Sequence, residues 1–151
     1  MNKKLGMDFL KVSMIYLGIS FTMGAIMTIM PIYRFVGLSM LFGRAHAHLG
    51  IVGGLSLAII GFVYIVLDYL NKPMHSERLG YMGFSLLNIG IVSEYIILII
   101  GGYRQACSYI DGDIDAYMKS VPYTMLTIIF AFVMLIGIYA TIYNIFKTSG
   151  K

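Results

Sequence analysis

Four long runs of apolar residues, separated by short polar segments, dominate the hydrophobic pattern of the chain. The runs cover approximately residues 12–30, 45–67, 79–103 and 121–146. Each is close to or above the roughly 20 residues that an α-helix needs to cross a bilayer. The pattern therefore predicts an all-α integral membrane protein. Because short connections favour antiparallel neighbours, the expected architecture is a four-transmembrane-helix up-down-up-down bundle that forms a single domain over residues 1–151.

The connection between the first two runs, residues 31–44, has the composition of a membrane interface. Pro31 is expected to end the first helix, and Arg34, Arg44 and several aromatic residues follow it. Such residues are typical of the headgroup level of a bilayer rather than of a water-exposed loop.

The distribution of basic residues predicts the orientation of the bundle. Seven lie on the side of the termini: Lys3, Lys4, Lys11, Lys72, Arg78, Lys147 and Lys151. Four lie on the other side: Arg34, Arg44, Arg104 and Lys119. The excess of positive charge favours both termini in the cytoplasm, with the protein in the plasma membrane.

The overall composition supports the same class of protein. The chain is 59% hydrophobic and only 12% charged, about half the ~25% of a soluble domain. The net charge of +4 then bears on topology and on anionic lipid headgroups in the bilayer, not on nucleic acid. The single cysteine excludes an internal disulfide and a cysteine-based metal cluster.

Two of the three histidines lie two residues apart where the second run begins. On a regular helix these side chains point about 200° apart, so His46 and His48 are not expected to face one ligand. The His46 face continues with small residues, which leave room for a flat cofactor or for a closely packed helix. The His48 face is bulky and apolar. His46 is therefore the better ligand candidate, and hydrogen bonding of both histidines at a wet helix end is the alternative.

The sequence from Arg44 to Tyr64, RAHAHLGIVGGLSLAIIGFVY, resembles the haem-ligand helix of subunit I in haem-copper oxidases and nitric oxide reductases. In that family an arginine shortly precedes a His-x-Asn or His-x-His pair, and a glycine-spaced apolar helix ends near a tyrosine. The segment is also similar to small four-helix membrane proteins described as oxidase subunit I-like. The resemblance implies that His46 is an axial ligand of haem b.

The chain departs from that family in its number of histidines. The catalytic enzymes have more helices and further histidines, which bind a second haem and a metal. Here the other three runs contain no histidine, and His75 lies in a turn on the opposite side. We therefore expect a cytochrome for electron transfer, with a respiratory-chain redox partner, or one that binds dioxygen or nitric oxide. A self-sufficient oxidase is not expected.

The sequence does not identify a second ligand for the haem iron. Two chains of a homo-oligomer can share one haem, a methionine can be the second ligand, or the haem can be five-coordinate. Met23, Met27 and Met30 stand at positions i, i+4 and i+7, which predicts one stripe at the depth of the histidines. Packing explains such a stripe, because thioethers fill irregular gaps; a His/Met haem is the alternative.

Two further functions compete with the haem hypothesis. Soft ligands select Cu(I), so His46, His48 and the methionines predict a copper-binding or copper-handling membrane protein. A cofactor-free accessory subunit of a respiratory complex is also compatible with the four runs.

Glu94 is a carboxylate within the third run. Ionisable residues inside a bilayer are functional candidates, here for proton transfer or for lining a polar cavity. The structural alternative is a hydrogen bond between helices, to a hydroxyl such as that of Ser56 or Thr127.

Three arginines share the expected side of the histidines: Arg34, Arg44 and Arg104. Guanidinium groups suit the carboxylates of haem propionates, and snorkelling toward the interface explains these arginines equally well. The aspartates of residues 111–115 have the start of a calcium-loop spacing without its glycine and glutamate, so a solvated loop is expected.

Overall fold

The computed structural model describes residues 2–150. Met1 and Lys151, the latter counted above for orientation, lie outside the described residues. The described part is helical, without a strand, as the pattern predicts. Its elements are α1 (Asn2–Met27), α2 (Met30–Val36), α3 (Met40–Ala47), the π-helical η1 (His48–Ser56), α4 (Leu57–Tyr69), α5 (Glu77–Ile110), the 3₁₀ turn η2 (Met118–Ser120) and α6 (Val121–Ser149).

Four helical segments in the described chain are long and apolar enough to cross a membrane. They are Asn2–Met27, Met40–Tyr69, Glu77–Ile110 and Met118–Ser149. The first begins well before residue 12 because Leu5 and Phe9, in the polar leader, are fully buried against other helices. The expectation that Pro31 ends this helix is wrong. The helix ends at Met27, and Pro31 lies in the first turn of α2, where the missing N–H of proline is tolerated.

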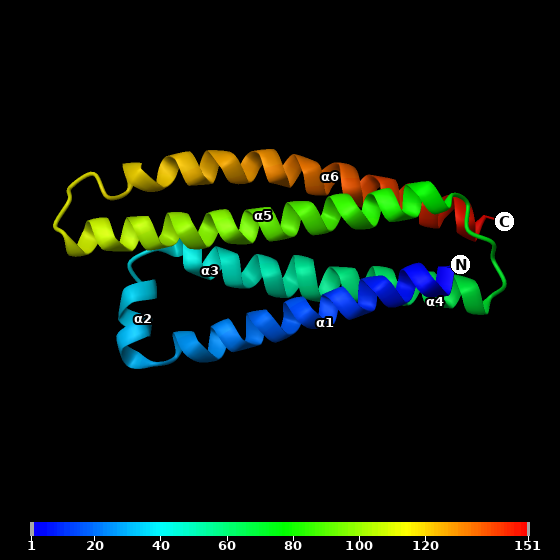
Figure 1. Ribbon diagram of the computed structural model, residues 1–151, viewed down its shortest axis with the longest axis horizontal. Helices are drawn as coiled ribbons and strands as arrows, with labels where there is room; N and C mark the ends of the chain where they lie inside the picture. Colours follow the sequence, from blue (N-terminus) through cyan, green and yellow to red (C-terminus); the bar gives the residue numbers. More distant parts are fainter. Residues whose placement is uncertain (1, 151) are drawn as a thin grey trace.

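Figure 1 shows the long segments side by side. The start of α1, the end of α6 and the α4–α5 turn lie at one end of the molecule, which we call the terminal end (Figure 1). Helix α2 and the α5–α6 connection lie at the opposite end, the α2 end. Helix α2 runs across the long helices at a steep angle, in the segment that the sequence assigns to the interface.

An aromatic cluster holds the terminal end together. The ring of Phe9 stacks on Tyr64 with centroids 5.9 Å apart and meets Phe84 edge-on at 4.9 Å. The Tyr64 hydroxyl accepts a hydrogen bond from Asn144 Nδ2 at 3.1 Å. Asn144 Oδ1 accepts in turn from the backbone N–H of Ser76 at 3.0 Å. The buried side chains of Tyr64 and Asn144 are thus paired, as most buried polar groups are.

Glycines let the helices approach to backbone contact. A Cβ added to Gly6 of α1 would lie 2.7 Å from the carbonyl oxygen of Gly61 on α4, and the reverse distance is also 2.7 Å. On α5, a Cβ at Gly83 would lie 3.0 Å from the carbonyl oxygen of Gly137 on α6. Such close approach is typical of helices that pack in lipid.

The α5–α6 loop gives a prediction about pH. Lys119 forms an ion pair with Asp113, and Asp113 Oδ1 also accepts from the Asp115 N–H at 2.9 Å. The Lys119 contact, followed by this amide, holds the pKa of Asp113 below its ordinary 3.8. A lowered pKa in the folded state means that the contact contributes above the unfolded value and is lost as the pH falls through the folded value.

We therefore expect the NMR shift of the Asp115 amide proton to titrate with a midpoint below 3.8, the ordinary pKa of Asp113. Asp113→Asn should remove this titration, because the asparagine side chain does not ionise. A midpoint at or above the ordinary value would contradict the ion pair.

Candidate functional site

His46 lies half-buried on α3 and faces α1. Its Nδ1 is 3.2 Å from Ser20 Oγ, and the same Oγ donates to the His46 carbonyl oxygen at 3.1 Å. The hydroxyl has only one hydrogen to donate. Both contacts can be hydrogen bonds at once only if Ser20 Oγ accepts from the Nδ1–H of the ring, and that tautomer leaves Nε2 with a free lone pair.

Small residues line the contact between α1 and the helix face that carries His46. A Cβ on Gly24 would lie 3.0 Å from the ring Cε1 and 3.6 Å from Nε2. Farther along the His46 face, a Cβ on Gly50 would lie 2.7 Å from Ser20 Oγ, and one on Gly53 would lie 2.8 Å from the Tyr16 ring. Of the two uses that the sequence leaves open for this face, a close helix is the one observed.

An apolar groove of about 620 Å³ lies between α1, α2 and α5. Phe42, one turn before His46 on α3, lines the groove, as do Met23 and Met27 on either side of Gly24. Ligand sites typically enclose ~300–1,000 Å³ and are mostly apolar. The groove is therefore large enough for a flat apolar group, although the residues that line it do not include His46.

The donor chemistry at His46 fits one axial bond to a haem iron. Such a bond needs a neutral imidazole with a free Nε2, and a ligating histidine usually donates its other N–H to a fixed acceptor. In the Nδ1–H tautomer Ser20 is that acceptor. Gly24 has no side chain at the point where a Cβ would crowd the ring.

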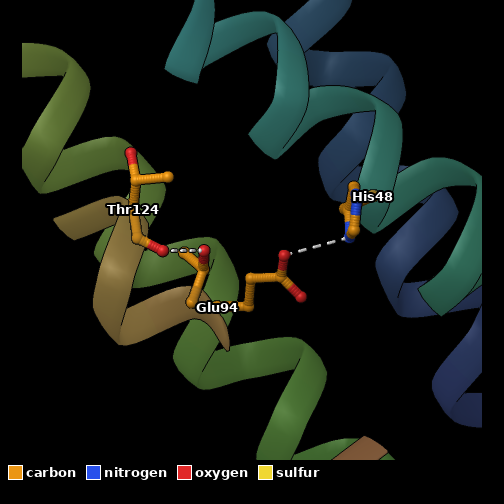
Figure 2. A network of polar contacts seen from close by, with 4 residues as sticks. His48, Glu94 and Thr124 are labelled. Carbon is orange, nitrogen blue, oxygen red and sulfur yellow. Dashed lines mark hydrogen bonds and ion pairs between the residues drawn. The ribbon is translucent and has the colours of Figure 1, made fainter. Parts of the chain in front are cut away.

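His48 points to α5 instead of α1. Its Nδ1 lies 3.3 Å from Glu94 Oε1 (Figure 2), with the His48 side chain 46% exposed and that of Glu94 8% exposed. The second oxygen of Glu94, Oε2, is buried and has no hydrogen-bond partner among the described residues. The helix becomes π-helical from His48 onward, yet the two histidines face different helices, as their spacing predicts.

The alternative prediction, a hydrogen bond from Glu94 to the hydroxyl of Ser56 or Thr127, is wrong. Ser56 Oγ donates to the Ile51 carbonyl oxygen at 3.0 Å, and Thr127 Oγ1 donates to the Thr124 carbonyl oxygen at 2.7 Å. Helical hydroxyls commonly bond to a carbonyl of the preceding turn of their own helix. In Figure 2 the Glu94 carboxylate points toward His48 and away from Thr124.

The methionines do not form one stripe. Met23 Sδ accepts from the Tyr95 hydroxyl at 3.7 Å, and Met27 lines the groove. Met30 begins α2 and is 61% exposed, so its expected place on α1 is wrong because α1 ends at Met27. Residues 2–150 contain no group of three or more His, Cys, Asp or Glu side chains placed to hold a metal ion.

The three arginines proposed for propionates lie on different elements at the α2 end. Arg34 is on α2, Arg44 on α3 and Arg104 in the last turns of α5, and all three are exposed. Arg34 lines a second cavity of about 520 Å³, which shares Met27 and Phe42 with the first. Their role toward a cofactor stays a prediction.

No protein-family model matches the chain, and a search of curated proteins finds no match. The site is therefore argued from its own residues. Sequence reasoning did not single out Ser20 and Gly24. They are small residues four positions apart on one face of α1, a pattern that indicates a closely approaching partner.

Proposed function

We propose that this protein is a haem b-binding membrane cytochrome in which His46 Nε2 is an axial ligand of the iron. The observation that carries the proposal is the contact between Ser20 Oγ and His46 Nδ1, because it suits the tautomer in which Nε2 can bind a metal. The resemblance of residues 44–64 to the haem-ligand helix of oxidase subunit I supports the same residue on separate grounds.

In this proposal the four apolar segments cross the plasma membrane as an up-down-up-down bundle with both termini in the cytoplasm. The excess of basic residues on the side of the termini supports that orientation. Helix α2 then lies at the outer interface, where the aromatic side chains Tyr33 and Phe35 and the basic Arg34 are favourable. His46 lies in the outer half of the bundle.

The chain's residues would hold the cofactor in an apolar, water-poor setting. Haem, when bound, supplies one-electron redox chemistry or a position for a diatomic gas at its iron. His46 would hold the iron, the apolar side chains of Met23, Met27 and Phe42 would keep water away from the nearby groove, and the exposed arginines at the α2 end would offer bidentate contacts to propionates. Since the chain has only three histidines, we propose an electron carrier or gas-binding protein, not a self-sufficient oxidase.

The optical spectrum tests the proposal. We expect protein purified from haem-replete cells to show a haem α-band in the reduced-minus-oxidised spectrum. His46→Ala should abolish the band, and His48→Ala, the matched control two residues away, should retain it. Loss of the band with His48→Ala alone would contradict the assignment to His46. Colourless protein with stoichiometric copper would favour the copper-binding alternative, and colourless, metal-free protein would contradict both metal proposals and favour an accessory subunit.

A further inference from the structure

The apolar groove between α1, α2 and α5 has the length of one lipid chain. Along α1 it extends from Met14 to Met27, which is about 20 Å at the helical rise of 1.5 Å per residue. One leaflet contributes about half of the ~30 Å hydrocarbon core of a bilayer. An extended acyl chain that crosses one leaflet therefore fits along the groove.

The walls of the groove present no free hydrogen-bonding hydroxyl hydrogen among the described residues. Apart from Thr22 and Tyr95, the side chains that line it are apolar. The Thr22 hydroxyl donates to the Gly18 carbonyl oxygen at 2.8 Å, and the Tyr95 hydroxyl donates to Met23 Sδ at 3.7 Å. A polar molecule would lose its own hydrogen bonds in such a groove. The groove is therefore suited to a hydrocarbon chain.

The second cavity, of about 520 Å³, continues the groove toward the α2 end. The groove and this cavity share Met27, Val36 and Phe42. Ile32 of α2 lines the groove, whereas Arg34 of α2 lines the second cavity. Helix α2 runs across the long helices at this end (Figure 1). A straight transmembrane helix laid in the groove would meet α2, whereas a flexible lipid can pass over the shared residues.

Arg34 brings a positive charge to the second cavity at the level expected for lipid headgroups. No ion pair found among the described residues includes Arg34, and residues 28–44 contain no aspartate or glutamate. A guanidinium can bind a phosphate through two parallel hydrogen bonds, and basic residues at the membrane surface attract anionic lipids. The charge of Arg34 is thus complementary to the phosphate of a lipid whose chain lies in the groove.

We propose that the groove and the second cavity together bind one phospholipid with an anionic headgroup. One acyl chain lies along α1 between Met14 and Met27, Arg34 holds the phosphate, and the other acyl chain stays in the bilayer. The lipid fills the apolar space between α1, α2 and α5 and fixes α2 against the long helices. This inference does not depend on haem, because His46 lines neither the groove nor the second cavity.

Brominated lipids test this site, because bromine quenches a nearby tryptophan and the chain has none of its own. Ile19→Trp places a tryptophan in the groove. Phe132→Trp is the matched control on α6, where Phe132 is 63% exposed. Each full-length variant is placed in phosphatidylcholine vesicles that contain a minor fraction of phosphatidylglycerol, with bromine on the chains of one lipid or the other. Per mole fraction, brominated phosphatidylglycerol should quench position 19 roughly fivefold more than brominated phosphatidylcholine, the preference that one basic residue gives. Position 132 should show no preference.

Two pairs of variants test the two parts of the site. In the Ile19→Trp background, Arg34→Gln should abolish the preference for phosphatidylglycerol. Arg44→Gln, which changes an exposed arginine outside the cavity, should retain it. Gly18→Leu fills part of the groove where an added Cβ would have nothing within 4 Å. It should lose the phosphatidylglycerol that native mass spectrometry detects on the purified wild-type chain, and Ala25→Leu, exposed on α1 outside the groove, should keep it.

Each part of the proposal has an outcome that overturns it. Equal quenching of position 19 by the two lipids would overturn the anionic site and leave ordinary bilayer contact. Quenching of position 132 but not of position 19 would overturn lipid binding and favour a second copy of the chain in the groove. A preference that survives Arg34→Gln would overturn the phosphate assignment, and lipid retained by Gly18→Leu would overturn the path of the acyl chain.

Discussion

Gly83→Ala should destabilise the protein by about 2–3 kcal/mol, although alanine is the better helix former. The added Cβ would lie 3.0 Å from the Gly137 carbonyl oxygen and 3.2 Å from the Thr141 backbone nitrogen. It would also meet the Thr141 hydroxyl, which is held by its bond to the Gly137 carbonyl oxygen. Because the two closest backbone atoms belong to α6 itself, they cannot rotate away, and the two helices have to separate.

The matched control is Gly43→Ala. Gly43 lies inside α3 and would have nothing within 4 Å of its Cβ, so alanine should stabilise the helix by roughly 0.5–1 kcal/mol. Unfolding in mixed micelles with increasing denaturing detergent, followed by circular dichroism, measures both variants. Similar changes for the two variants would contradict the α5–α6 backbone contact at Gly83.

The four long helices could be predicted from the sequence because length and hydropathy alone define them. Their ends could not, because tertiary packing decides them. Leu5 and Phe9 lie in a leader with lysines and an aspartate, and only the contact with α4 and α5 makes them a buried part of α1. Pro31 ends no helix, since α1 stops before it and a new helix begins there.

At the site, local geometry predicted the divergence of the histidines, and long-range neighbours decided their partners. The spacing of His46 and His48 directs them to different helices, but which helix lies on each side depends on the whole bundle. For Glu94 the sequence indicates a hydroxyl partner only as the structural alternative, because it does not show which side chains lie near the carboxylate. The hydroxyls bond to their own helix, which leaves the imidazole of His48 as the available partner. The small face of His46 admits α1 for the same long-range reason.

His48→Ala should destabilise the protein by about 2 kcal/mol, because it leaves a buried carboxyl without its partner. The Glu94 side chain is 8% exposed, and its contact to His48 Nδ1 at 3.3 Å is the hydrogen-bonding contact found for it among the described residues. Its Oε2 is already unpaired there. The ring of His48 is 46% exposed, so its own lost packing contributes less than the stranded Glu94.

The double variant separates these two contributions. Glu94→Met fills a similar volume without a polar group, and replacing a buried polar pair by apolar side chains is often neutral. We therefore expect His48→Ala to have almost no effect when Glu94→Met is already present. His46→Ala with Glu94→Met is the matched control and should be additive, because His46 contacts Ser20 on a different helix. If the His48 and Glu94 effects were additive as well, the energetic role of the pair would be refuted, and His48 would act through packing alone.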